Sequence, residues 1–92
     1  MFYVVAFDIS DDKKRYRCAK ALKGLGTRVQ KSVFECPNLS ERRFLKLKTA
    51  IEKIIDHTTD TVRYYRLCGD CLDKVEVSGT GSQPDNSDVH VV

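Results

Sequence analysis

The spacing of hydrophobic and polar positions changes several times along this 92-residue chain, and each change marks a new predicted element. Residues 2–7 form an unbroken apolar run that ends at Asp8, which is typical of a buried strand over about residues 2–9. Apolar residues then recur three or four positions apart, which predicts an amphipathic helix over about residues 11–25. Its inward face consists of Cys18, Ala19, Leu22 and Leu25.

The ends of the expected helices carry residues that suit them. Ser10 is predicted to cap the first helix, and the two acids that follow it favour the positive helix terminus. The glycines at positions 24 and 26 are predicted to end that helix by supplying left-handed backbone. Ser40 is predicted to cap a second helix, in which the apolar spacing continues to Ile55.

Three further stretches favour strands. Residues 27–36 contain few breakers but exceed the usual length of one strand, so they are predicted to form two strands divided by a tight turn or bulge near residues 30–32. Residues 61–67 are predicted to form the fourth strand. Residues 74–78 alternate polar and apolar side chains, which indicates a possible fifth strand.

The resulting order, βαββαβ, predicts an α+β fold of the ferredoxin-like plan, with two helices on one face of an antiparallel sheet. We expect residues 1–79 to form this domain and residues 80–92 to form a polar linker and a C-terminal tail. Val89–Val92 is apolar, so it is predicted to be an edge strand that pairs with the partner subunit. The uncovered sheet face also needs a partner, which predicts a homodimer packed sheet against sheet.

Positive charge is concentrated in one part of the chain. The net charge is +3, yet residues 13–34 contain eight bases and no acid, and the rest of the chain has eight bases against thirteen acids. Such polarity favours an oriented anionic partner, for which we expect a nucleic acid, although a solvated helix face would give a similar run. The eight bases are Lys13, Lys14, Arg15, Arg17, Lys20, Lys23, Arg28 and Lys31.

The chain shows no secretory signal and no apolar run of about 18 residues that would span a bilayer. We therefore expect a cytoplasmic protein without a membrane partner. Its four cysteines are then expected to be reduced thiols.

Cys68 and Cys71 form a Cys-x-x-Cys pattern that allows three interpretations. The pair is half of a structural zinc site, which needs four ligands. A redox pair of the thioredoxin type is expected at the start of a helix, whereas this pair is predicted to join two strands. Plain structural thiols are the interpretation that the sequence favours.

Several blocks of the sequence agree in order and spacing with one family. Over roughly residues 1–79 the chain closely resembles the CRISPR-associated protein 2 family. The blocks are Phe2–Asp8 with residues 9–12, Gly26–Gln30, Ser32–Cys36, Val62–Tyr65, Leu67–Cys68 and Val75–Gly79. The resemblance implies a small ferredoxin-like homodimer that works with a larger CRISPR adaptation integrase in acquiring spacers from foreign DNA. It also implies a metal-dependent endonuclease that acts on single-stranded RNA or double-stranded DNA.

The resemblance assigns roles to individual residues. Asp8 matches the family's metal-binding acid, which implies catalysis with Mg²⁺, whereas from the residues alone it suits a metal ligand and a helix-capping acid equally. Positions implicated in activity or nucleic-acid contact are matched by Arg15, Arg17, Arg28 and Phe34. The base-rich run adds Lys13, Lys14, Lys20 and Lys31 as candidate nucleic-acid contacts, and Lys31 departs from the aromatic residue that is frequent at its position.

Two functions are compatible with these residues. In the first, the homodimer is a Mg²⁺-dependent endonuclease in which Asp8 holds the metal and arginines neutralise charge that develops in the transition state. Two Asp8 carboxylates could share one ion if the two-fold axis passes near the end of the first strand. In the second, the dimer is a non-catalytic DNA-binding scaffold that bridges integrase subunits, and any nuclease activity is incidental.

Overall fold

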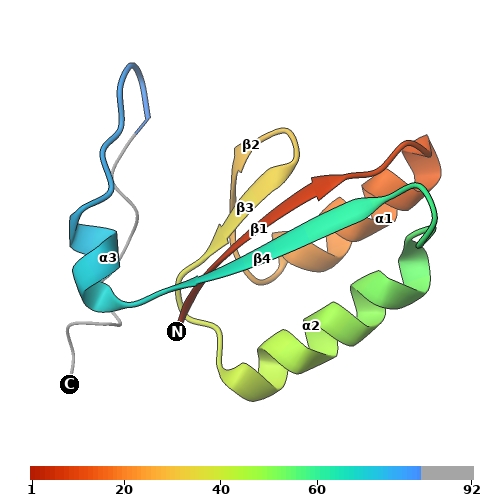
Figure 1. Ribbon diagram of the computed structural model, residues 1–92, viewed down its shortest axis with the longest axis horizontal. Helices are drawn as coiled ribbons and strands as arrows, with labels where there is room; N and C mark the ends of the chain where they lie inside the picture. The colour runs from red at the N-terminus through yellow and green to blue at the C-terminus, as the bar shows by residue number, and fades with distance from the viewer. Residues whose placement is uncertain (82–92) are drawn as a thin grey trace.

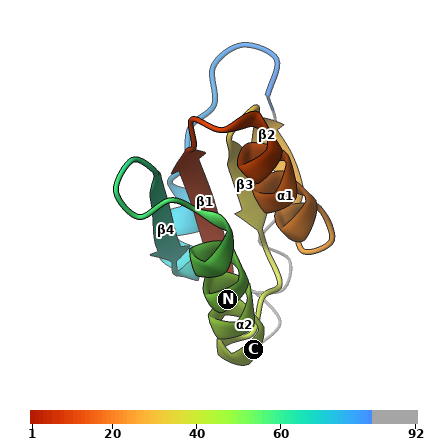
Figure 2. The same ribbon diagram turned by 90° about the vertical axis from the view of Figure 1, so that its right-hand side faces the viewer.

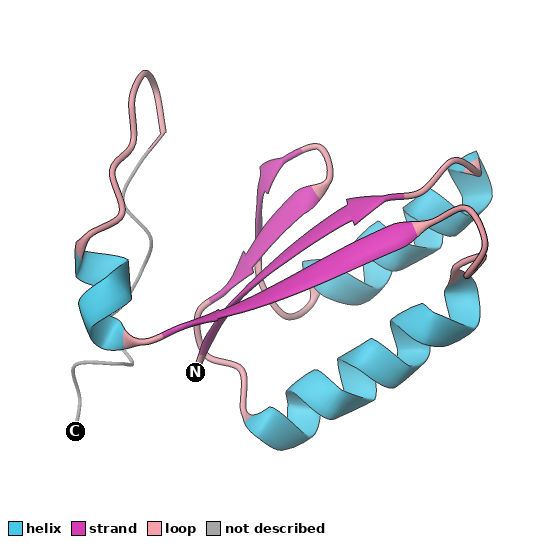
Figure 3. Ribbon diagram, viewed as in Figure 1, coloured by secondary structure: helices cyan, strands magenta, loops and turns pink. Residues whose placement is uncertain are grey.

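The structure is a computed structural model that describes residues 1–81, which form one four-stranded sheet and three helices. Figures 1 and 3 show their arrangement as a ribbon. In chain order the elements are β1 (Phe2–Asp8), α1 (Asp12–Lys23), β2 (Thr27–Gln30), β3 (Val33–Cys36), α2 (Glu41–Ile54), β4 (Thr61–Leu67) and α3 (Gly69–Asp73). The predicted tail strand Val89–Val92 lies outside the described residues, and the expected domain boundary at residue 79 stays a prediction.

The sheet has the strand order β2-β3-β1-β4, and every neighbouring pair is antiparallel. The predicted α+β fold of the ferredoxin-like plan is therefore confirmed, with β1 in the centre of the sheet. The irregularity predicted near residues 30–32 is also present, because the register of β2 against β3 shifts between Arg28 and Gln30. None of the described helices is long and apolar enough to cross a membrane.

The two long helices, α1 and α2, pack on the same face of the sheet (Figure 2). Side chains alternate between the faces of a strand, so every second residue of β1 points toward these helices. The core between the layers includes Tyr3, Val5, Phe7, Cys18, Leu22, Phe34, Leu47 and Ile51. An aromatic contact joins the layers, because Phe44 of α2 stacks on Tyr3 with the ring centroids 4.2 Å apart.

The other face of the sheet carries the alternate residues of the strands. Along β1 these are Phe2, which is buried, Val4 and Ala6, which are half-buried, and Asp8, which is exposed. Across the strand pair, Val4 lies opposite Tyr65 and Ala6 lies opposite Arg63 of β4. Neither α1 nor α2 covers this face (Figure 2), and we refer to it as the open face.

The helix starts agree with the sequence prediction at α2 and differ from it at α1. Ser40 caps α2 as predicted, since its hydroxyl accepts a hydrogen bond from the backbone N–H of Arg43 at 3.2 Å. At α1 the cap is Asp11 rather than Ser10, because the Asp11 carboxylate accepts the N–H of Lys14 at 2.9 Å. The helix thus begins one residue later than a Ser10 cap would give.

The two glycines after α1 do not use left-handed backbone, contrary to the prediction. Gly24 ends the helix with φ −79°, and among the described residues only Gly79 has a positive φ. Gly26 is needed for a different reason: a β-carbon there would lie 2.7 Å from Cys36 Sγ and would collide with the backbone carbonyl of Glu35. Close approach to β3, not a turn, requires glycine at this position.

The predicted fifth strand at residues 74–78 is absent from the described part of the chain, which enters α3 directly after β4. Cys68 caps this short helix, because its Sγ accepts the backbone N–H of Cys71 at 3.4 Å. The helix places Leu72 in a buried position, 2% exposed. The chain leaves the sheet at α3 (Figure 1), and the alternating residues that follow pair with none of its four strands.

Candidate nucleic-acid interface and metal-binding carboxylate

Asp8 is the last residue of β1, at the point where pairing with β4 ends opposite Thr61. Its side chain is exposed and belongs to the open face, with the other alternate residues of β1. Within residues 1–81 it takes part in no hydrogen bond or ion pair. Because Asp11 caps α1, the capping function that the sequence also allowed is not performed by Asp8, and its carboxylate is available to a ligand.

The segment that follows Asp8 is held from both sides. From α1, Arg15 donates a hydrogen bond from Nη1 to the carbonyl of Ile9 at 2.9 Å. From the start of β4, Asp60 accepts hydrogen bonds from the backbone N–H and the hydroxyl of Ser10, at 3.3 and 3.4 Å. These contacts fix the direction in which the chain leaves β1 and, with it, the position of Asp8.

Asp56 and Asp60 organise the turn before β4. Asp60 Oδ2 accepts the backbone N–H of Asp56 at 2.9 Å, and Asp56 Oδ1 accepts the N–H and the hydroxyl of Thr58 at 2.9 and 2.7 Å. These hydrogen bonds lower the pKa of both carboxyl groups. The largest effect on Asp56 comes from the side chain of Thr58, and the largest effect on Asp60 comes from the backbone N–H of Asp56. Both carboxylates therefore serve the turn.

The described residues contain no cluster of three or more His, Cys, Asp or Glu side chains that could hold a metal ion. Asp8 thus offers one carboxylate per chain. A carboxylate fits a hard divalent cation, which takes one or two protein carboxylates and completes its coordination with water and phosphate oxygens. A second copy of the chain would add a second Asp8 carboxylate.

The bases of α1 differ in their orientation. Lys13, Arg17 and Lys20 are exposed and three or four residues apart, so they form a ridge along the outer side of the helix. Lys14 and Arg15 are half-buried. Both terminal nitrogens of Arg15 are engaged, Nη1 with the carbonyl of Ile9 and Nη2 with the exposed carboxylate of Asp12. Arg15 is therefore a positioning residue rather than an open contact for phosphate.

The β2–β3 hairpin carries the remaining bases of the run. Arg28 lies over the ring of Phe34, with its guanidinium carbon 5.5 Å from the ring centroid, and its Nε donates to the carbonyl of Lys31 at 2.9 Å. Phe34 is 1% exposed and packs against Phe7 in the core. Its ring lies beneath the Arg28 guanidinium and borders a groove between α1 and β2. The expected direct contact of Phe34 with nucleic acid stays a prediction.

A groove of about 620 Å³ lies between α1 and β2. Lys20, Lys23 and Arg28 line it, and Tyr16 adds an aromatic ring that is 67% exposed. Cations pair with phosphates and aromatic rings stack on bases, so this lining suits a nucleic-acid strand. The sequence prediction omits Tyr16, although its helical spacing with Lys20 and Lys23 indicates that they share one face of α1. We refer to the exposed bases as the basic surface: Lys13, Arg17, Lys20, Lys23, Arg28 and Lys31.

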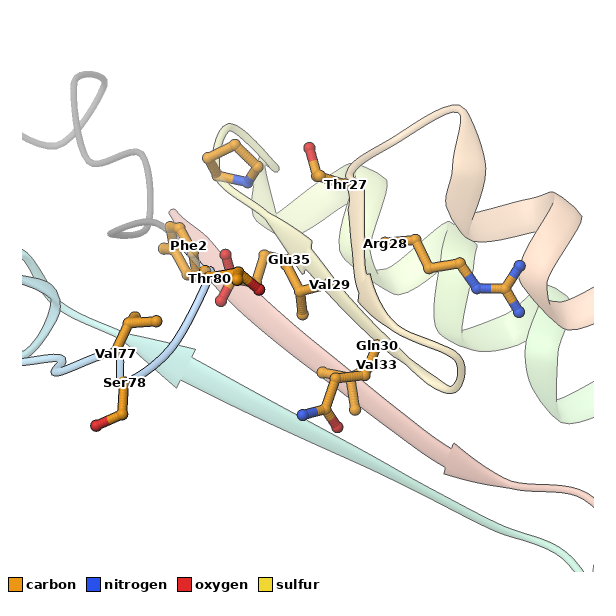
Figure 4. A pocket seen from close by; sticks show the side chains of 12 residues that line it. Phe2, Thr27, Arg28, Val29, Gln30, Val33, Glu35, Val77, Ser78 and Thr80 are labelled. Atoms are coloured by element: carbon orange, nitrogen blue, oxygen red, sulfur yellow. The ribbon is translucent and has the colours of Figure 1, made fainter.

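A second groove, of about 740 Å³, lies between the β2–β3 hairpin and the segment after α3 (Figure 4). Phe2, Val33 and Val77 give it apolar walls. Glu35 adds a carboxyl group whose pKa is raised by burial. Arg28 contributes to the lining of both grooves, and in Figure 4 its guanidinium points away from the other labelled side chains. This second lining suits a protein surface better than a polyanion.

The sequence matches a known family over most of its length. The model of the family described as CRISPR associated protein Cas2 matches residues 1–75. This chain belongs to the Cas2 family. The matched range contains Asp8, α1 and the β2–β3 hairpin, and therefore the whole of the basic surface.

Similar proteins agree with this assignment. A "CRISPR-associated endoribonuclease Cas2 1" of Chloroflexus aurantiacus is 39% identical over 94 residues, which cover 100% of both chains. A "CRISPR-associated endonuclease Cas2 2" of Thermus thermophilus is 41% identical over 98% of this chain and 94% of the relative. A chain in the solved structure of a partial Cas6-RT-Cas1–Cas2 complex is 30% identical, with a TM-score of 0.72 over 84% of this chain and 89% of that chain.

Proposed function

We propose that this chain is a metal-dependent nuclease of CRISPR adaptation, which binds nucleic acid on the basic surface and hydrolyses a phosphodiester bond beside Asp8. The observation that carries the proposal is the Asp8 carboxylate, which is exposed at the end of β1 and unpaired within residues 1–81, in a chain of the Cas2 family. The names of the two relatives, an endoribonuclease and an endonuclease, support RNA or DNA as the substrate.

Each group has one task in this proposal. Asp8 holds Mg²⁺, which supplies Lewis-acid activation of the phosphodiester when bound. Arg15 and Asp60 hold the segment after β1, so that the Asp8 carboxylate keeps its direction. Lys20 and Arg28 bind phosphates along the strand, which orients it without reading its sequence.

The first partner that we propose is a second copy of the chain. The open face carries half-buried Val4 and Ala6 beside Tyr65, whose ring is 47% exposed. Packing two such faces together would remove apolar surface from water, as expected of a homodimer. Asp8 lies at the end of the same face, so a two-fold axis near it would bring two carboxylates to one metal ion.

Cleavage of labelled single-stranded RNA and double-stranded DNA, with Mg²⁺ or with a chelator, tests the nuclease. Asp8→Asn should abolish cleavage while leaving nucleic-acid affinity and the dimer unchanged, as measured by filter binding and sedimentation. Asp11→Ser is the matched control, because serine also caps helices, and it should cleave at the wild-type rate. Undiminished cleavage by Asp8→Asn would overturn the proposed role of Asp8.

A second function, a non-catalytic DNA-binding scaffold that bridges integrase subunits, is favoured by a different observation. The basic surface extends over α1 and the hairpin, whereas the described residues bring no cluster of three or more metal-binding side chains together. The similarity to a chain in a Cas1–Cas2 complex supports a larger integrase as the partner.

Charge reversal tests the nucleic-acid binding that both functions require, and spacer acquisition by Asp8→Asn separates them. Replacing Arg17, Lys20 and Arg28 by glutamate should weaken duplex binding and flatten its salt dependence, since phosphate contacts release counterions. The scaffold requires Asp8→Asn to support spacer acquisition in cells at the wild-type level. Loss of acquisition by a folded Asp8→Asn dimer that still binds its partner would exclude the scaffold as the sole function.

A further inference from the structure

Cys68 and Cys71 lie outside every surface discussed so far, and both side chains are exposed and free. Their Sγ atoms are 3.3 Å apart. A disulfide bond measures about 2.05 Å, so the two sulfur atoms need to approach by little more than about 1 Å to bond. The helix α3 brings them together, because a helical turn between the two residues replaces the strand connection that the sequence predicts.

Hydrogen bonds make the two thiols unequal. Cys68 Sγ accepts the backbone N–H of Cys71 at 3.4 Å and lies within hydrogen-bond distance of the Cys71 thiol. These contacts, the backbone bond first, lower the pKa of the Cys68 thiol. The contact between the two side chains raises the pKa of the Cys71 thiol. Since the thiolate is the nucleophile in thiol–disulfide exchange, Cys68 is the residue that attacks first.

The other two cysteines of the chain provide a contrast within the same molecule. Cys18 and Cys36 are core residues with 0% exposure, and burial raises the pKa of each thiol to about 11. Neither thiol meets solvent or an oxidant while the protein is folded. Only the exposed pair therefore combines access, proximity and an activated sulfur.

We propose that Cys68 and Cys71 form a reversible dithiol–disulfide couple, with a small-molecule disulfide as the oxidant. The Cys68 thiolate attacks one sulfur of the oxidant, which forms a mixed disulfide and releases one thiolate. Cys71 gives its proton to solvent and attacks Cys68 Sγ, which closes the intramolecular disulfide and releases the second thiolate. The pair loses two electrons and two protons, and the oxidant becomes two thiols.

The couple lies at the point where the chain leaves the sheet. Cys68 directly follows β4, and the chain after α3 supplies Val77 and Ser78 to the groove beside the β2–β3 hairpin (Figures 1 and 4). Hydrogen bonds and the burial of Leu72 hold the first turn of α3 in the reduced pair, whereas a disulfide would also fix it covalently. Oxidation should therefore slow hydrogen exchange at Leu72.

The test equilibrates the full, reduced chain with glutathione buffers of increasing oxidation and follows it by alkylation and mass spectrometry. The mass of the wild type should fall by two hydrogen atoms, and Cys68 and Cys71 should become resistant to alkylation together. The buried thiols of Cys18 and Cys36 should react with the alkylating reagent only after unfolding. Cys71→Ser should accumulate a glutathione adduct at Cys68. Cys68→Ser should react more slowly, and Cys36→Ala should behave as the wild type does.

Three results would overturn the proposal. The first is an exposed pair that stays reduced in fully oxidised glutathione. The second is a wild type that stops at glutathione adducts on both cysteines without an intramolecular bond. The third is purified protein that carries zinc in stoichiometric amount and resists oxidation for that reason. Circular dichroism of each variant distinguishes these results from loss of the fold.

Discussion

Arg15 and Ile9 are joined by a hydrogen bond from the arginine Nη1 to the isoleucine carbonyl, 2.9 Å long. The bond crosses from the first half of α1 to the residue that follows Asp8. One base of the cationic run is thereby used to hold the end of β1, while Arg17, two positions further along the helix, is exposed. The neighbouring bases therefore differ in function, although their charge is the same.

Arg15→Lys should lower the free energy of unfolding by about 1–2 kcal/mol, because a charged hydrogen bond to a part-buried carbonyl is lost. Arg17→Lys, the matched control on the outer side of the helix, should change it by less than about 0.5 kcal/mol. Urea unfolding monitored by circular dichroism measures both values. Two variants of equal stability would show that the bond to Ile9 does not hold the loop.

Gly26→Ala should destabilise the fold by about 1–3 kcal/mol, because its β-carbon would enter space that Cys36 Sγ and the Glu35 backbone occupy. Gly24→Ala is the matched control. Nothing lies within 4 Å of a β-carbon there, and φ −79° suits any residue. That variant should gain about 0.4–1 kcal/mol through the lower entropy of the unfolded chain.

Thermal unfolding of the two glycine variants in one buffer gives the sign of each change. A Gly26→Ala protein that melts with the wild type would mean that β3 moves aside without cost.

Periodicity predicts those parts of the fold in which a face is buried. β4 has the predicted bounds, Thr61–Leu67, and β2 and β3 are divided at the predicted place. The alternation at residues 74–78 predicts a strand that does not form, because a local bond from the Cys71 N–H to Cys68 Sγ starts a helix before them. Hydropathy carries no information about such a cap or about which sheet edge is within reach.

The candidate site is predictable in composition but not in orientation. The base-rich run identifies α1 and the hairpin, yet Arg15 turns toward Ile9 and Phe34 turns into the core. Tyr16 differs from Phe34, because its aromatic ring is 67% exposed and lines the same groove as Lys20. Charge belongs to a residue, whereas the direction of its side chain depends on the neighbours that fill the space around it.

Tyr64→Phe should stabilise the protein by about 1 kcal/mol, because the Tyr64 hydroxyl is buried without a hydrogen-bond partner among the described residues. The variant keeps the ring that meets Phe44 edge-on, with the centroids 5.4 Å apart. Tyr65→Phe is the control, since Tyr65 is 47% exposed, and it should change stability by less than about 0.5 kcal/mol. Denaturant titration decides the point, and a less stable Tyr64→Phe would reveal a partner for the hydroxyl.

Glu35 makes the stability of the chain depend on pH. Burial raises the pKa of this carboxyl group above its ordinary value of 4.5, so the folded chain holds the proton more tightly than the unfolded chain does. A group with a raised pKa stabilises the folded state fully at pH values below its pKa in the unfolded chain. This stabilisation is lost as the pH rises through its pKa in the folded chain. Wild type is therefore penalised by Glu35 at neutral pH and not at acid pH.

Glu35→Gln removes the group that ionises, so the variant should melt at a higher temperature than the wild type at neutral pH. The two proteins should converge as the pH falls below the ordinary value of 4.5. Glu41→Gln, in the exposed first turn of α2, should give no such gain, because an acid there favours the helix start. Melting temperatures across this pH range measure the difference. A gap between Glu35→Gln and wild type that stays constant with pH would assign the effect to packing and exclude ionisation of Glu35 as its cause.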